Sequence, residues 1–113
     1  MANAFSVQPS LVVMSDGKVV LSGGRPGLFL WVNADGTGKD WQRVDILALH
    51  NAAHPEEAIR QPGNTTSYTE IVALDDTHLI YMYDRIPHGW SAIPKESADT
   101  NSIWVVRVSL EQP

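Results

Sequence analysis

Short apolar runs separated by turns rich in Gly, Pro and Asp dominate this chain, and they predict β-strands. Leu11–Met14 and Lys18–Leu21 flank a turn at residues 15–17 that contains Asp and Gly, which is typical of a β-hairpin. Leu28–Val32 is apolar at every position and predicts a strand buried on both faces, whereas Trp41–Ile46 alternates between apolar and polar residues. Four antiparallel strands within about 40 residues match the size of one β-propeller blade.

A second unit follows after an interruption. Residues 47–66 contain a short helical turn, with Pro55 at a first-turn position, and a loop. Strands are then predicted at Tyr68–Leu74, Leu79–Asp84 and Ser102–Leu110, with a long loop over residues 85–101. We therefore expect a single all-β domain over residues 1–113. It comprises a first blade at 9–46, a connection at 47–66 and a second blade at 67–110, each blade a four-stranded antiparallel sheet.

The charge and composition of the chain exclude several classes of binding partner and site. The net charge is −5, and the eight Lys and Arg residues form no basic cluster, so we expect no nucleic-acid partner. No apolar run approaches the roughly 20 residues of a membrane span, so we expect no membrane partner. With no Cys, the chain has no disulfide, thiol nucleophile or cysteine metal site. The first residues lack the pattern of a signal peptide, which predicts a cytoplasmic protein as written and leaves the compartment open.

The turn over residues 33–41, Asn-Ala-Asp-Gly-Thr-Gly-Lys-Asp-Trp, resembles the Asp-box of sialidases and related propellers, Ser-x-Asp-x-Gly-x-Thr-Trp. In such a turn the Asp accepts backbone N–H bonds, the Gly takes a positive φ and the Trp packs beneath. Asp35, Gly38 and Trp41 match these structural roles. Asn33 in place of Ser and one extra residue before Trp41 depart from the pattern. As a metal site, Asp35 and Asp40 lack a full set of ligands.

The resemblance spans residues 9–110 and corresponds to the C-terminal portion of a six-bladed sialidase-like propeller. It implies that Arg25, within Gly-Gly-Arg-Pro-Gly, is one of three arginines that grip the carboxylate of the substrate. The planar guanidinium suits this role because it can bind a carboxylate through two hydrogen bonds. The alternative is a loop arginine that pairs with a surface acid or with backbone carbonyls.

The same resemblance implies that Tyr68 occupies the position of the catalytic nucleophile, tyrosine being the exception that sialidases make among glycosidases. A phenol with a pKa near 10 needs a neighbouring carboxylate to accept its proton at neutral pH. Glu70 is on the same strand face as Tyr68, since side chains alternate with a period of two. In the family, however, that carboxylate comes from an earlier blade. The alternative is a half-buried tyrosine at the edge of a strand.

Aromatic and histidine residues provide the remaining candidates. Trp90, in the long loop, is a candidate for stacking on a substrate, and the alternative is that it caps an edge of the core. Trp104 lies in an apolar strand and is predicted to be in the core. His50 and His54 have the i, i+4 spacing of some zinc sites, but neither a Glu base nor a third ligand accompanies them. We expect no metal and no cofactor.

Two blades leave apolar sheet faces without neighbours, so we expect self-association. A trimer would rebuild a six-bladed ring with Arg25 and Tyr68 turned towards its axis, and a dimer is the competing arrangement. The outermost strand of the second blade is expected from residues 3–7 of the same chain or of a partner.

The expected function is binding of a carbohydrate or carboxylate ligand, such as sialic acid or another anionic sugar, without complete hydrolytic machinery. One alternative is that the chain is the C-terminal part of a sialidase-type exo-glycosidase, active only with the missing blades. The other alternative is a structural fragment without a ligand.

Overall fold

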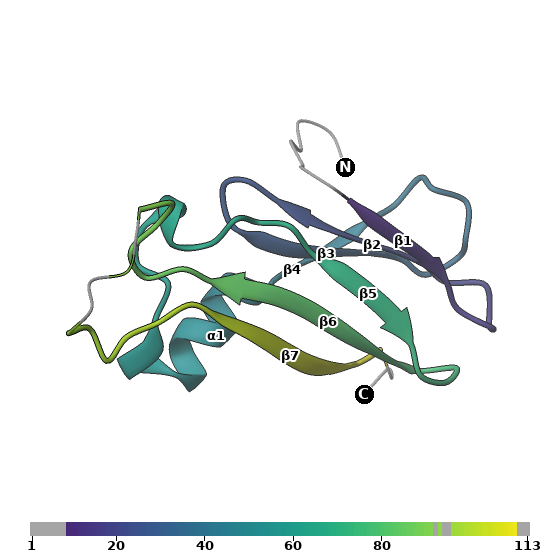
Figure 1. Ribbon diagram of the computed structural model, residues 1–113. Coiled ribbons are helices and arrows are strands. Elements are labelled where there is room, and N and C mark those ends of the chain that lie inside the picture. Colours follow the sequence, from purple (N-terminus) through teal and green to yellow (C-terminus); the bar gives the residue numbers. More distant parts are fainter. Residues whose placement is uncertain (1–8, 92, 94–95, 111–113) are drawn as a thin grey trace.

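The computed structural model describes residues 9–91, 93 and 96–110, and in it two antiparallel β-sheets pack face to face (Figure 1). The first sheet has the order β1-β2-β3-β4 and the second has the order β5-β6-β7. Their bounds are β1 Ser10–Val13, β2 Val19–Gly24, β3 Leu28–Asn33, β4 Gln42–Asp45, β5 Glu70–Ala73, β6 His78–Arg85 and β7 Ser102–Ser109. The prediction of an all-β fold with two antiparallel sheets is confirmed.

The second sheet has three strands among the described residues, where a four-stranded blade was expected. The expected fourth strand, at residues 3–7, lies outside the described residues. The β7 strand is therefore an edge of the sheet as described, with one side of its backbone unpaired within that sheet.

The connection between the sheets is more helical than predicted. Helix α1, Ile46–Ala53, starts at the residue where the fourth strand was expected to end, and two short 3₁₀ turns follow at Pro55–Glu57 and Pro62–Asn64. The helix begins at this point because the Asp45 carboxylate accepts a hydrogen bond from the Ala48 amide at 2.9 Å. Asp45 thus ends strand β4 and caps the helix. No helix in the described part of the chain is long and apolar enough to cross a membrane.

The core lies between the two sheets. Val20 and Leu30 from the first sheet and Leu79 and Tyr81 from the second are all 0% exposed. Burial alternates along β6, so one face of that strand points inward and the other outward. Trp104 was predicted to be in the core and is only partly buried, at the margin of the cluster.

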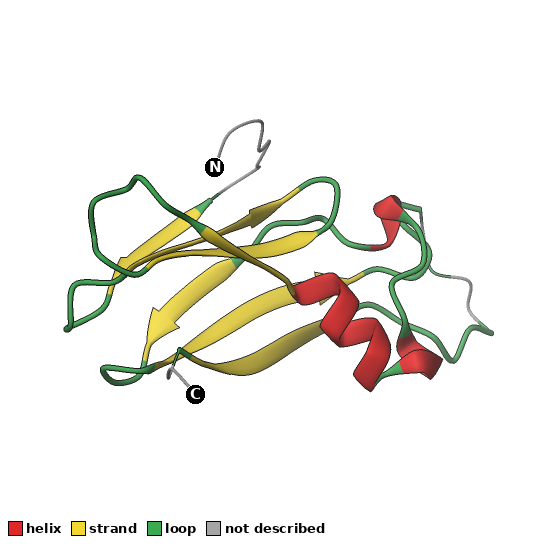
Figure 2. Ribbon diagram, turned by 180° about the vertical axis from the view of Figure 1, so that it is seen from behind, coloured by secondary structure: helices red, strands yellow, loops and turns green. Residues whose placement is uncertain are grey.

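The sandwich is wedge-shaped. The two sheets approach each other where β1 and β2 contact β5, and helix α1 lies between the opposite edges, β4 and β7 (Figure 2). A cavity of about 670 Å³ remains beside the helix, and its lining includes Val44, Ile46, His50, Trp104 and Val106. The sheets therefore diverge from the β1/β5 side towards the β4/β7 side.

Candidate functional site

Arg25 and Tyr68 lie against each other at one end of the sandwich. The Arg25 Cζ atom is 5.2 Å from the centroid of the Tyr68 ring, within the range of a cation–π contact. Its Nη2 atom donates a hydrogen bond to the carbonyl oxygen of Thr66 at 2.9 Å. Arg25 belongs to the loop between β2 and β3, and Tyr68 precedes β5, so the two sheets contribute one residue each. The structure thus brings together two of the three residues for which the sequence predicts substrate contact, the third being Trp90.

Strained backbone marks both segments of this site. Arg25 has a φ of 90° and Ser67 a φ of 62°, and non-glycine residues rarely adopt such values. The two segments are held together because the Ser67 hydroxyl donates to the carbonyl of Gly27 at 2.8 Å. A Cβ atom on Gly24 would lie 1.9 Å from the Gly27 carbonyl oxygen, so glycine is required there. Strain of this kind clusters at ligand-binding sites.

A carboxylate fixes the segment that leads to Tyr68. The Asp84 side chain accepts hydrogen bonds from the Thr65 hydroxyl at 2.8 Å, from the Thr66 amide at 2.8 Å and from the Thr66 hydroxyl at 2.6 Å. Sequence reasoning missed this role of Asp84. The signal was the pair of threonines just before Tyr68, but no pattern along the chain joins them to the end of β6.

Tyr68 borders a shallow pocket of about 230 Å³ on the outer side of the second sheet. Glu70, Met82, Asp84 and Ile103 also line it, and the Tyr68 side chain is 40% exposed. Glu70 therefore shares a pocket with Tyr68, and its carboxylate accepts a hydrogen bond from the Ser10 hydroxyl at 3.3 Å. Among the described residues, no carboxylate is hydrogen-bonded to the Tyr68 hydroxyl.

The guanidinium group of Arg25 has N–H donors that can bind a ligand. Within the described part of the chain, the Lys and Arg residues that pair with a carboxylate are Lys18 and Arg85, and Arg25 makes no such pair. Its side chain is exposed, and it uses one guanidinium nitrogen on the Thr66 carbonyl. The remaining N–H donors of the guanidinium are open to a ligand.

The turn after β3 lies at the opposite end of the strand from Arg25, because β3 starts beside the Arg25 loop and ends at Asn33. The Asp35 carboxylate accepts hydrogen bonds from the Thr37 amide at 3.0 Å and from the Thr37 hydroxyl at 2.7 Å. The hydrogen bond from the amide, and to a smaller extent the one from the hydroxyl, lowers the pKa of Asp35. Gly38 has a φ of 77°, and the Trp41 indole donates to the Gly38 carbonyl at 2.9 Å.

Asn33 holds this turn from inside. It is fully buried, its side-chain oxygen accepts from the Gly38 amide at 2.9 Å, and its side-chain nitrogen donates to the Asp40 carbonyl at 2.7 Å. The sequence identified Asn33 only as a departure from the Asp-box pattern. In the structure it provides both the acceptor and the donor that close the turn.

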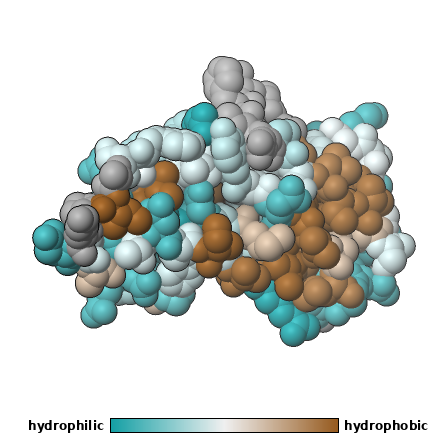
Figure 3. Space-filling model, viewed as in Figure 1, coloured by the Kyte–Doolittle hydropathy of each residue, from teal (hydrophilic) through white to brown (hydrophobic). Residues whose placement is uncertain are grey.

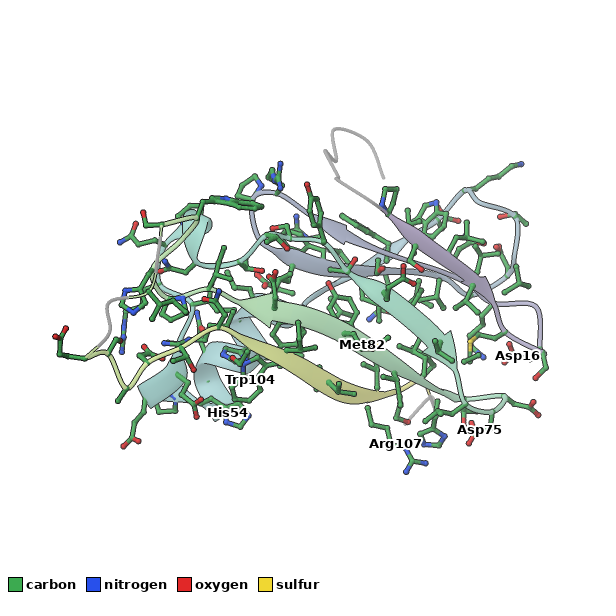
Figure 4. The ribbon with its side chains drawn as sticks, viewed as in Figure 1. Asp16, His54, Asp75, Met82, Trp104 and Arg107 are labelled. Carbon is green, nitrogen blue, oxygen red and sulfur yellow. The ribbon has the colours of Figure 1, made fainter. Side chains whose placement is uncertain are left out.

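The histidine pair is not arranged as a metal site. Both ring nitrogens of His50 are engaged, Nδ1 with the Tyr83 hydroxyl at 2.6 Å and Nε2 with the Glu57 carbonyl at 2.8 Å. The His54 ring lies against Trp104 in a tilted contact with a centroid distance of 4.7 Å, and both residues are labelled in Figure 4. The described residues contain no group of three His, Asp or Glu side chains that could hold a metal ion.

The long loop is anchored rather than free. Arg85 is 4% exposed and binds the Asp99 carboxylate through two hydrogen bonds of 2.6 Å and 2.9 Å, an ion pair that the sequence did not reveal. Trp90 is 73% exposed, so it does not cap the core, and it does not line the pocket beside Tyr68.

No protein-family model, curated protein or solved structure matches this chain. The functional assignment therefore depends on the geometry described above together with the motifs of the sequence.

Proposed function

We propose that this protein binds a carbohydrate that carries a carboxylate, such as a sialic acid, at the Arg25–Tyr68 site. The observation that carries the proposal is an exposed arginine, held against a tyrosine ring by a strained loop and without a carboxylate partner among the described residues. A guanidinium positioned in this way offers a carboxylate a charge-assisted, bidentate contact.

The charges around Tyr68 favour one orientation of the ligand. Glu70 and Asp84 line the pocket on one side of the tyrosine and would repel a ligand carboxylate there. Carboxylates accept hydrogen bonds, so the same side suits the hydroxyl groups of a sugar. The acid group of the ligand would bind Arg25, and the hydroxyl groups would face Glu70. A ligand that combines both groups fits this site better than a simple carboxylate.

The resemblance of the sequence to sialidase-like propellers suggests how the two sheets would be completed. On that view the two sheets are two blades of a six-bladed ring, and self-association completes the ring, with a trimer favoured over a dimer. The wedge shape and the face-to-face packing of the sheets support the idea. The turn at Asp35, Gly38 and Trp41 would then be an Asp-box in which Asn33 replaces Ser.

A hydrolytic role is the second candidate, because Tyr68 is exposed and shares a pocket with Glu70. In this candidate the chain is the C-terminal part of an exo-glycosidase. Without a carboxylate hydrogen-bonded to the Tyr68 hydroxyl in the described residues, we expect the chain alone to bind but not to hydrolyse. A fluorogenic sialoside distinguishes these functions, since turnover by the isolated chain would favour the enzyme.

Isothermal titration with N-acetylneuraminic acid and with its methyl ester tests the binding proposal. We expect the acid to bind and the ester, which lacks the charge, to bind at least about tenfold more weakly, because a charge-assisted hydrogen bond contributes about 1.5–3 kcal/mol. Arg25→Gln should reduce binding of the acid to the level of the ester.

Arg60→Gln is the matched control, because the exposed Arg60 guanidinium, like that of Arg25, donates a hydrogen bond from its Nη2 atom to a backbone carbonyl, that of Pro55 at 3.0 Å. We expect this variant to bind like the wild-type chain. Equal affinity for acid and ester, or equal losses in both variants, would contradict a specific role for Arg25. The absence of any binding by the folded wild-type chain would favour a structural fragment without a ligand.

A further inference from the structure

Each sheet presents a second apolar face, turned away from the core. The β1–β4 face carries Leu11, Val13, Leu21 and Phe29 around Trp31, which is only 6% exposed, and the β5–β7 face carries Val72, Ile80, Met82, Ile103 and Val105. Exposure reaches 61% at Leu11 and 60% at Val13 on the first face, and 74% at Ile103 and 58% at Val105 on the second. Figure 3 shows apolar side chains gathered where Figure 1 places β1, β5 and β6, and Met82 lies on β6 (Figure 4).

We propose that these two faces form one interface between copies of this chain, in which the β1–β4 face of one copy packs on the β5–β7 face of the next. This inference specifies the self-association that forms part of the proposed function. Each face is covered by another copy of the chain. The contact is head-to-tail because it joins two different faces.

The area that a copy can bury is larger when both of its faces take part in contacts. Strands β2 and β3 have six residues each and so extend roughly 20 Å, and four strands about 4.8 Å apart span roughly 19 Å. One face is thus on the order of 400 Å² in projection, and a copy that uses both faces contributes about 800 Å² in total, divided between two contacts. A dimer through one kind of face would leave the other exposed on both copies. Head-to-tail contact covers both faces of every copy.

The wedge shape determines how such a chain of contacts continues. The sheets converge on the β1/β5 side and are held apart by helix α1 on the β4/β7 side. Wedges stacked face to face curve towards their narrow side, and we expect this curvature to close the contacts into a ring. The narrow side, with β1 and β5, would then face the axis of the ring.

Charges at one end of the two faces are complementary. Arg43 lies over Phe29 at the Arg25 end of the β1–β4 face, and Glu70 and Asp84 lie beside Ile103 at the Tyr68 end of the β5–β7 face. A ring with its axis along the strands keeps these ends together, so Arg43 of one copy faces the acidic pocket of the next. Asp45, on the same face as Arg43, is already bound to the Ala48 amide. The neighbouring copy would therefore complete the pocket beside Tyr68.

The first test is the solution mass by light scattering, with three lysine variants of similar starting exposure. Val13→Lys alters one face, Val105→Lys alters the other, and Leu49→Lys, 59% exposed on α1, lies on neither. We expect a discrete oligomer for the wild-type chain and for Leu49→Lys, and monomers for the other two. All three positions are exposed in the single chain, so the variants should fold, which circular dichroism would verify. A wild-type monomer, or an oligomer that survives both face substitutions, would overturn the proposal.

Disulfide trapping tests the head-to-tail direction, since the sequence contains no Cys. Leu11→Cys and Val72→Cys lie on different faces, both near the β1/β5 side. Each variant alone should remain uncrosslinked on oxidation, and an equal mixture should give a crosslinked heterodimer. Crosslinking of either variant to itself, without the mixed product, would overturn the head-to-tail contact.

The interface and the ligand proposal can fail separately. A monomer that still binds N-acetylneuraminic acid through Arg25 would overturn the interface and leave the binding site intact. An oligomer with these crosslinks that fails to bind the acid would do the opposite.

Discussion

The Nδ1 atom of His50 lies 2.6 Å from the hydroxyl oxygen of Tyr83, which joins helix α1 to strand β6 inside the protein. Both residues are buried, and the two rings meet edge to face with centroids 5.4 Å apart. This histidine therefore acts as a structural link between the helix and the second sheet.

His50→Ala should destabilise the fold by about 2–4 kcal/mol, because it removes buried contacts and leaves the Tyr83 hydroxyl and the Glu57 carbonyl without their partner. His54→Ala is the matched variant at the C-cap of the same helix, where the side chain is exposed, and should cost much less. Urea denaturation of both variants measures the difference. Equal losses would mean that the buried hydrogen bonds of His50 contribute little.

Asn33→Ala should destabilise the turn after β3 by about 1–3 kcal/mol, since it removes the buried side chain that binds both the Gly38 amide and the Asp40 carbonyl. Asp35→Ala removes only exposed hydrogen bonds with Thr37 and should have a smaller effect. Thermal unfolding followed by tryptophan fluorescence compares the two variants. A larger loss for Asp35→Ala would assign the main role in the turn to the exposed carboxylate.

Stability should fall at alkaline pH because of two buried phenols. Burial raises the pKa of Tyr83 to about 12, and burial also raises the pKa of Tyr81 above its ordinary value of 10.0. Both groups ionise more readily in the unfolded chain. Their contribution to stability is therefore fully present below about pH 10 and is lost as the pH rises towards 12. Urea midpoints between pH 9 and pH 12 measure this loss, and a midpoint that stays constant over the range would contradict it.

Asp99→Asn should loosen the long loop after β6. The substitution removes the carboxylate that binds Arg85 and leaves a buried guanidinium without its counter-ion. We expect faster amide hydrogen exchange in the described residues 96–101 and at the end of β6. Glu96→Gln, an exposed acid in the same loop, should leave exchange unchanged. Slow exchange in the Asp99 variant would show that the loop does not depend on the ion pair.

The strands and both sheets could be predicted from the sequence, because alternating burial and turn residues are local signals. Helix α1 was underestimated because Asp45 and Ile46 fit the end of a strand as well as the start of a helix, and only the bond to the Ala48 amide identifies the cap. Arg25 and Tyr68 were identified singly, through their motifs. Their contact was not predictable in the same way, since it depends on how two separate sheets are aligned.

Interactions between distant residues were the least predictable part of the site. Asp84 reaches back to the segment before Tyr68, and Arg85 reaches forward to Asp99, across loops whose path no local pattern specifies. Both residues stand at the end of β6 and looked like ordinary strand-end charges. Their roles follow from the tertiary fold.

The close approach of Gly24, Gly27 and Ser67 has a consequence for which sequences this fold can accept. A side chain at position 24 would collide with the Gly27 carbonyl and lie 3.3 Å from the Ser67 side chain, so the two loops fit each other only as a matched pair. In a saturation mutagenesis library, these three positions should behave as one unit. Substitutions at one of them would be rescued only by compensating changes at another, and an insertion in either loop would be tolerated only with a change in its counterpart.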